Sequence, residues 1–152
     1  YSYWKDDALV EADLGSRQTD ITATLTREAI GFIEANRSQP FLLYYAHKNV
    51  HTPLFPSPAF AGRSEAGPYG DSVEELDASV GEIVNALASR GLLEDTLVFF
   101  TSDNGGANYI GLPEVNRPYR GWKLTLFEGG IHVPFFVSWP APAGPSSVTA
   151  RA

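Results

Sequence analysis

Thr96-Leu97-Val98-Phe99-Phe100-Thr101-Ser102-Asp103-Asn104-Gly105-Gly106 is the stretch that decides the fold. Its first six residues are apolar or β-branched without alternation, a pattern typical of a strand buried on both faces in a parallel sheet. A polar turn with two glycines follows directly. Because ligands of α/β sheets bind beyond the carboxyl ends of the strands, this turn is a candidate functional site.

Two helices are predicted from apolar residues at helical spacing. The first begins after Asp20, the expected N-cap, and ends before Ser38-Gln39-Pro40. The second begins near Asp71 or Ser72, with Ser72-Val73-Glu74-Glu75 as a capping box, and is ended by Gly91. The two apolar stripes consist of Ile21, Leu25, Ala29, Phe32 and Ile33, and of Val73, Leu76, Val80, Ile83, Val84 and Leu87.

Residues 41–46 and 133–139 form two further apolar runs of strand length. The order helix, strand, helix, strand, loop, strand predicts an α/β sandwich with a largely parallel central sheet. Residues 1–18 are predicted to be an irregular polar lead-in, and the tail from Pro140 is open-ended. Long loops follow the first two strands, so His51 and Asp103 are expected at the same edge of the sheet.

The composition is that of a single globular domain. The 152 residues are 43% hydrophobic and 12% aromatic, more than disordered chains contain. A net charge of −7 argues against nucleic acid as a partner, because phosphate binding needs clustered Lys and Arg. Without Cys there is no disulfide and no thiolate zinc site. No apolar run reaches the ~18 residues of a membrane span, and residues 1–20 lack the pattern of a secretory signal.

Asp103 and Asn104 are adjacent oxygen donors at the end of a predicted strand. Hard cations such as Ca²⁺ prefer carboxylate and amide oxygens, but a calcium site needs about six to eight of them. An ordinary Asp-Asn-Gly turn, stabilised by its own side chains, explains the local pattern as well or better. Taken alone, the pair favours the turn over the metal site.

His51 and Lys123 are the other candidate functional residues. His51 lies on a loop stiffened by Pro53, where it could bind an anion or protonate a leaving oxygen; a structural loop histidine is an equal alternative. Lys123 precedes Glu128-Gly129-Gly130 and could bind sulfate or phosphate, although a lone lysine is more often solvated.

The remaining titratable residues are predicted to be structural. His47, near its strand, is expected to be structural, and His132, flanked by apolar residues, is expected to be a packed or edge residue. Acidic residues on the second helix are expected to cap it or to lie on its solvated face; they are Asp71, Glu74, Glu75 and Asp77.

Four motifs, in this order along the chain, resemble the sulfatase family, whose fold is that of the alkaline phosphatase superfamily. They are 40–44 leading to His51-Thr52-Pro53; Tyr69-Gly70-Asp71 with 75–77 and 80–81; 96–105; and Lys123 with 128–130 and 133–134. Residues 60–64 are especially similar to the arylsulfatase A-like branch. The similarity covers roughly residues 18–140, so 1–152 is predicted to be a middle segment of a sulfatase catalytic domain, with 141–152 as its open tail.

The resemblance implies roles for the four candidate residues. Asp103 and Asn104 match positions that ligate one calcium ion, whose remaining ligands lie outside this chain. His51 matches a residue that contacts the sulfate and its leaving oxygen, and Lys123 matches one that binds a sulfate oxygen. The family attacks sulfur with the hydrate of a formylglycine made from Cys or Ser. Calcium, Lys and His stabilise the charge that builds on the sulfate.

The family's nucleophile motif, Cys/Ser-x-Pro-x-Arg, and its early pair of Asp ligands do not occur here. Both lie upstream in sulfatases, so we expect them outside this chain and expect no turnover by the 152-residue segment alone. Two alternatives remain open: a phosphoesterase of the same superfamily, and a non-catalytic sulfatase-like module.

The resemblance also implies the kind of partner and the compartment. The expected substrate is a sulfate ester of a small molecule, a glycan or a sulfolipid. Family members are lysosomal, secreted or periplasmic, which sets the expectation for localisation. The sequence makes no prediction about oligomeric state.

Overall fold

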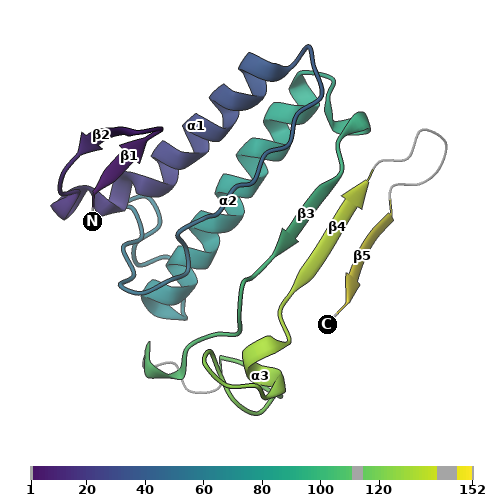
Figure 1. Cartoon of the computed structure of the whole chain (residues 1–152). Helices are drawn as coiled ribbons and strands as arrows, with labels where there is room; N and C mark the ends of the chain where they lie inside the picture. The colour runs from purple at the N-terminus through teal and green to yellow at the C-terminus, as the bar shows by residue number, and fades with distance from the viewer. Residues whose placement is uncertain (1, 111–114, 140–146, 152) are drawn as a thin grey trace. The chain divides into compact units, whose positions relative to one another are not determined.

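Two long helices dominate the first part of the chain: α1 (Ile21–Asn36) and α2 (Gly67–Ser89) lie side by side (Figure 1). They run in the same direction, because Thr26 contacts Ser79 midway along them and Glu34 contacts Arg90 at their carboxyl ends. This computed structural model describes residues 2–110, 115–139 and 147–151. The chain forms two units, Tyr1–Arg90 and Gly91–Ala152.

The first unit also contains a hairpin and a short helix. Strands β1 (Tyr3–Lys5) and β2 (Ala8–Glu11) pair antiparallel, and the 3-10 helix η1 (Gly15–Asp20) leads into α1. The prediction of an irregular lead-in over residues 1–18 was therefore wrong. The innermost pair, Lys5 and Ala8, encloses a two-residue polar turn, and strands this short carry no strong signal in the sequence.

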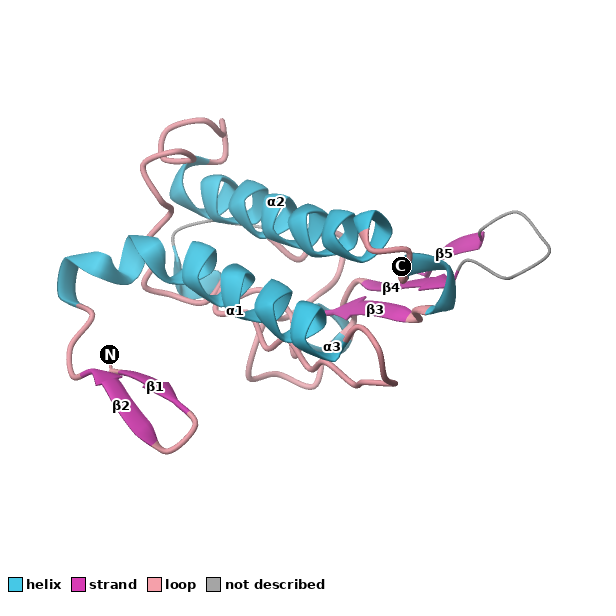
Figure 2. Ribbon diagram, turned by 90° about the horizontal axis from the view of Figure 1, so that it is seen from above, coloured by secondary structure: helices cyan, strands magenta, loops and turns pink. Residues whose placement is uncertain are grey.

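The second unit is built on a three-stranded sheet. Its strands are β3 (Val98–Thr101), β4 (Phe135–Trp139) and β5 (Ser147–Arg151), all antiparallel to their neighbours, and they lie side by side in Figure 2. The short helices are η2 (Leu93–Asp95), η3 (Asn108–Ile110) and α3 (Glu128–Ile131). Phe99 and Phe100 lie opposite Val137 and Phe136 in the register.

The expected parallel central sheet is not found in the part of the chain that the structure describes, where both sheets are antiparallel. Strands at 98–101 and 135–139 occur where they were predicted, but residues 41–46 form neither a helix nor a paired strand. Leu42 is 88% exposed and Tyr44 87% exposed, so this run is not buried on both faces as predicted. An apolar run without alternation favours a strand, but it does not indicate which other strand would pair with it.

The α1–α2 interface is more polar than the apolar stripes predicted. Ile21, Ala29 and Ile33 are buried as expected. On α2 Leu87 is buried as expected, but the rest of the buried face consists of Gly70, Asp71, Ser72, Glu75, Ser79 and Ala86. Thr26 Oγ1 and Ser79 Oγ lie 2.7 Å apart between the helices, and the Tyr45 hydroxyl lies within 3.3 Å of both oxygens. These hydroxyl groups satisfy one another, which makes their burial tolerable.

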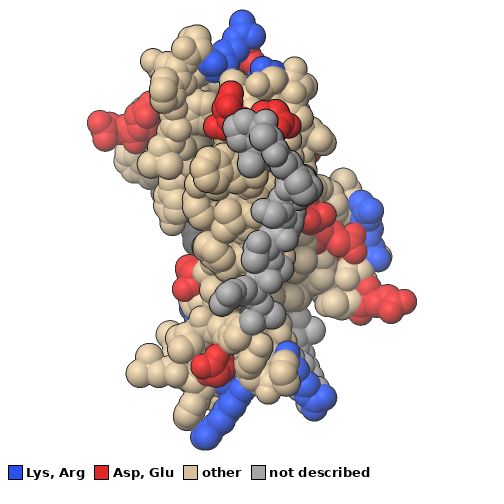
Figure 3. Space-filling view, turned by 90° about the vertical axis from the view of Figure 1, so that its right-hand side faces the viewer, with Lys and Arg blue, Asp and Glu red and all other residues tan. Residues whose placement is uncertain are grey.

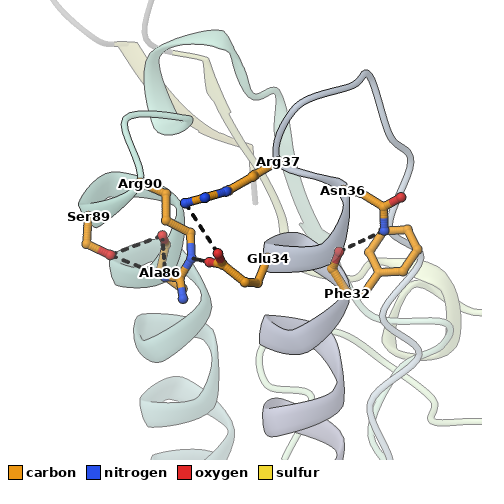
Figure 4. Close-up of polar contacts among 7 residues, drawn as sticks. All are labelled: Phe32, Glu34, Asn36, Arg37, Ala86, Ser89 and Arg90. Carbon is orange, nitrogen blue, oxygen red and sulfur yellow. Dashed lines mark hydrogen bonds and ion pairs between the residues drawn. The ribbon is translucent and has the colours of Figure 1, made fainter.

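The carboxyl ends of α1 and α2 are joined by charged side chains (Figure 4). Arg90 Nε donates to Glu34 Oε2, Arg37 reaches the other oxygen of Glu34 at 3.3 Å, and Arg90 Nη1 donates to the carbonyl of Ala86 at 2.9 Å. Gly91 follows with φ +68°, the left-handed conformation that ends a helix and that glycine adopts readily. The predicted end of the second helix is confirmed.

Candidate functional site

The turn after β3 presents the two predicted metal-binding side chains. Ser102 Oγ donates to the carbonyl of Asn104 at 2.9 Å, and Asn104 Nδ2 donates to the carbonyl of Gly105 at 3.3 Å. Asp103 is exposed, and no described residue donates a hydrogen bond to its carboxylate or pairs with it. The turn is thus stabilised by Ser102 and Asn104, and the Asp103 oxygens are not used to hold it together.

The turn is packed backbone to backbone against α3. Gly105 N donates to the carbonyl of Gly130 at 2.9 Å. A Cβ on Gly105 would overlap the carbonyl oxygen of Gly129 and lie 3.0 Å from Gly130 Cα. Glycine is therefore required at position 105 by the close approach of two backbone segments.

Lys123 is held next to the same turn through its own backbone. Lys123 N donates to the carbonyl of Gly106 at 3.1 Å. Asn116 also contacts Gly106: its Nδ2 donates to the Gly106 carbonyl and its Oδ1 accepts from the Gly106 N–H, each at 2.8 Å. The second unit therefore brings the segments of Asp103, Asn104 and Lys123 together.

His51 lies in the first unit, and its position relative to Asp103, Asn104 and Lys123 is not determined. It sits in a turn in which His51 N donates to the carbonyl of Lys48 at 3.0 Å. Its Nδ1 lies 2.6 Å from the carbonyl oxygen of Thr52, and since that oxygen can only accept, Nδ1 carries a proton. In the neutral ring Nε2 is then the unprotonated nitrogen.

The loop that carries His51 is anchored on the two helices by Asn49 and Glu75. Asn49 Nδ2 lies 3.3 Å from Thr22 Oγ1 and 3.4 Å from both the Ser72 carbonyl and Glu75 Oε2. Glu75 is 4% exposed and also accepts from Ser57 N at 3.4 Å. Asn49 lies two residues before His51, so these contacts hold the base of the His51 turn.

Asp71 anchors the other end of the same loop. It is 2% exposed, and its carboxylate accepts from the backbone N–H groups of Gly62, Arg63 and Ser64 at 2.7 to 3.0 Å. These bonds, that of Ser64 foremost, lower the pKa of Asp71. The predicted cap and solvated face were therefore wrong for Asp71 and Glu75. Helix α2 begins four residues before Asp71, at Gly67, which places both carboxyl groups on the buried face.

The other two histidines have structural contacts, as expected. His47 Nδ1 accepts from Asn49 N at 2.8 Å, its ring meets Tyr45 edge-on, and burial lowers its pKa. His132 stacks on the Tyr119 ring at 4.2 Å, and its Nδ1 lies 2.8 Å from Glu128 Oε2.

Asn116, Asp71 and Glu75 were missed as supporting residues by reasoning from sequence. A signal was present for Glu75, because Ser72, Glu75 and Ser79 share one face of α2 with spacing i, i+3, i+7. For Asn116, the sequence offered only a polar residue between two glycine-containing segments.

The donor chemistry fits a hard cation, but the number of donors does not complete a site. Asp103 and Asn104 offer oxygen ligands, as calcium requires. Among the described residues no group of three or more His, Asp or Glu side chains could hold a metal ion. Any calcium bound here would take most of its ligands from elsewhere.

The described surface carries charges of both signs. On the face drawn in Figure 3 the Lys and Arg side chains stand at separate places, with Asp and Glu among them. No helix in the described ranges combines the length and apolar character needed to cross a bilayer.

In the second unit the turn after β3 offers oxygen donors beside the backbone of the Lys123 segment, and comparison with known proteins identifies the family. A family model described as Sulfatase matches residues 2–151. The chain belongs to the sulfatase family. This confirms the resemblance drawn from the four motifs.

Curated relatives share high identity over most of the chain. Mouse (Mus musculus) steryl-sulfatase is 43% identical over 147 residues, covering 91% of this chain and 24% of that protein. The N-acetylgalactosamine-6-O-sulfatase of Bacteroides thetaiotaomicron is 37% identical over 153 residues, covering 94% and 28%. The chain thus spans about a quarter of the length of the curated relatives it matches.

Solved structures support the α/β fold. A Bacteroides thetaiotaomicron protein from work on the metabolism of multiple glycosaminoglycans matches with a TM-score of 0.78 at 37% identity, covering 84% of this chain and 29% of that one. The PsFucS1 sulfatase from Pseudoalteromonas sp. matches with a TM-score of 0.74 at 32% identity, covering 82% and 25%.

Proposed function

We propose that this chain is a middle segment of a sulfuric ester hydrolase that cleaves a sulfate monoester. Membership of the sulfatase family supports the reaction class. The observation that carries the assignment of residues is the 3.1 Å bond from Lys123 N to the carbonyl of Gly106, which ties a cationic segment to the Asp103-Asn104 turn. The nucleophile, a formylglycine in our proposal, belongs to sequence outside this chain.

Asp103 and Asn104 are proposed as two ligands of a calcium ion. The Asp103 carboxylate suits this role because no described residue occupies its oxygens. A calcium ion supplies positive charge opposite the sulfate oxygens, where negative charge develops during cleavage. The remaining ligands would come from outside this chain.

Lys123 and His51 are proposed to bind the sulfate group. The Lys123 ammonium acts as a compact point charge for a sulfate oxygen. Because the Thr52 carbonyl keeps Nδ1 of His51 as a donor, Nε2 is the nitrogen that would gain a proton and pass it to the leaving oxygen. His51 therefore has to be in its doubly protonated form at that moment.

The substrate class is proposed from the names of the relatives. They include a steryl-sulfatase and an N-acetylgalactosamine-6-O-sulfatase, and one solved relative is a complex with k-i-k-neocarrahexaose. A sulfated glycan is the substrate we favour, with a steryl sulfate as the comparison in the same assay.

The test is hydrolysis by the full-length protein that contains this segment. Asp103→Ala and Lys123→Ala should each lower kcat/KM for a sulfate ester by about 10²–10³-fold, the usual loss for one electrostatic contact to a transition state. Asp95→Ala is the matched control, since Asp95 is exposed in η2. Unchanged kcat/KM in either site variant would remove that residue from the site.

Two further measurements separate the alternatives. A phosphate monoester assayed beside the sulfate ester distinguishes a phosphoesterase, and a full-length protein inactive on both is a non-catalytic module. The 152-residue chain alone is expected to be inactive; hydrolysis of an aryl sulfate by it would contradict the proposal that the nucleophile lies elsewhere.

A further inference from the structure

We propose that Asn116 is a positioning residue that holds the Lys123 segment in register with the Asp103-Asn104 turn. The inference rests on the proposed function for its catalytic meaning, but its geometry stands on the second unit alone. The described hydrogen bonds of the Asn116 side chain all go to backbone groups. It acts through the backbone of Gly106 and Gly121.

The Asn116 amide pairs with both backbone groups of Gly106. Gly106 N donates to Asn116 Oδ1 and Asn116 Nδ2 donates to the Gly106 carbonyl, each at 2.8 Å. This closed pair resembles the exchange of two hydrogen bonds between neighbouring β-strands. It fixes Gly106 in two directions, and Gly106 lies two residues beyond Asn104.

The same amide group reaches the segment that carries Lys123. Asn116 Nδ2 also donates to the carbonyl of Gly121 at 3.2 Å, two residues before Lys123. The Gly106 carbonyl accepts from Lys123 N at 3.1 Å as well. One side chain therefore bridges two segments that are 15 residues apart, and both hydrogens of its NH₂ group are in use.

The fit around Asn116 leaves little freedom. A Cβ on Gly106 would lie 2.8 Å from Val115 Cγ1 and 3.1 Å from Asn116 Oδ1, so the amide can approach the backbone closely because residue 106 has no side chain. Asn116 is half-buried. An aspartate there would keep the acceptor for Gly106 N but would direct a negative oxygen at the carbonyls of Gly106 and Gly121.

The first experiment needs no variant. Amide hydrogen exchange on the unmodified chain should find the Gly106 and Lys123 N–H groups protected, because each is a donor in this network. Exchange of both groups at the rate of unstructured peptide would overturn the proposal.

The second experiment compares Asn116→Asp and Asn116→Ala with Asn108→Asp in the full-length protein. Asn108 is exposed and makes no side-chain hydrogen bond to a described residue, so its variant controls for the added charge. We expect calcium affinity, measured by titration calorimetry, to fall about 10-fold or more in the Asn116 variants, as when a residue supporting metal ligands is lost. The Asn108 variant should bind as the unmodified protein does.

The outcomes separate the two proposals. If the unmodified protein binds no calcium and hydrolyses no sulfate ester, the proposed function fails, while hydrogen exchange still decides the role of Asn116. If it binds and hydrolyses, and the Asn116 variants match it in calcium affinity and in exchange at Gly106 and Lys123, the positioning role is overturned. Should both Asn116 variants fail to fold, protection in the unmodified chain remains the deciding measurement.

Discussion

Asp71 accepts a hydrogen bond from the backbone N–H of Ser64 at 2.7 Å, so a helix residue closes the loop that precedes its own helix. The N–H groups of Gly62 and Arg63 donate to the same carboxylate. Three donors on one ion replace the water that burial removes from it. The loop that begins near His51 is thereby fixed at its far end to α2.

The stability of the first unit should depend on the ionisation of Asp71. Because the backbone N–H of Ser64, with Gly62 and Arg63, holds the pKa of Asp71 below its usual value of about 3.9, the folded state binds this proton less readily than the unfolded state. The stabilisation is therefore present above the unfolded pKa and is lost as the pH falls through the folded pKa. Thermal unfolding of the unmodified chain and of Asp71→Asn, between about pH 7 and pH 2, measures this.

Asp71→Asn should unfold at lower temperature near neutral pH, and the gap to the unmodified chain should narrow on acidification. Asp77→Asn is the control, since Asp77 lies exposed on the same helix and makes no side-chain bond to a described residue. If the difference in unfolding temperature between Asp71→Asn and the unmodified chain does not change with pH, the ionised form of Asp71 does not stabilise the folded state.

The hydroxyl groups of Thr26 and Ser79, which lie between the two helices, should contribute jointly to the free energy of unfolding. Thr26→Val and Ser79→Ala should each lower the free energy of unfolding by about 1 kcal/mol, the usual net value of one buried hydrogen bond. The double variant should cost less than the sum, because either change already removes the 2.7 Å contact. Urea unfolding gives all three values, and Ser38→Ala at an exposed position is the control. Additive losses would show that the pair is not coupled.

The positions of helices and strands along the chain were predicted better than the contacts that these elements make with one another. Helix α1 begins one residue after the predicted N-cap Asp20, and α2 ends where Gly91 predicted, because these boundaries depend on local backbone chemistry. The expected parallel pairing is not found among the described strands, because an apolar run does not indicate which strand lies next to it. The buried Glu75 looked like a solvated residue because its partners, Asn49 and Ser57, are distant in sequence.

In the candidate site, too, the residues that depend on local sequence were predicted and those that depend on long-range contacts were not. The pattern of motifs predicted that Asp103 and Asn104 would end a strand, and they follow β3. It gave no sign of Asn116, whose role depends on contacts with Gly106 and Gly121 across a folded loop. Long-range backbone contacts of this kind carry no periodicity that a sequence reveals.

Ile33 should be the apolar side chain whose truncation costs most in the first unit. It is 1% exposed, so Ile33→Ala removes buried methyl groups and leaves a cavity, at a cost of about 2–5 kcal/mol. Leu42→Ala is the matched control in the 152-residue chain: Leu42 is 88% exposed, and its loss should change the free energy of unfolding by less than about 0.5 kcal/mol. Chemical denaturation measures both. Equal effects would mean that the helix pair does not form this core.

Gly105 and Gly81 should respond to alanine with opposite sign. A Cβ at Gly105 meets the backbone of Gly129, which cannot move aside as a flexible side chain could, so Gly105→Ala should cost about 1–3 kcal/mol or more. Gly81 lies within α2 with nothing within 4 Å of a Cβ, and Gly81→Ala should stabilise the chain by about 0.5–1 kcal/mol through helix propensity. Amide exchange at Gly105, whose N–H donates to Gly130, should quicken in the first variant and not in the second. A neutral Gly105→Ala would mean that the turn after β3 does not pack closely on α3.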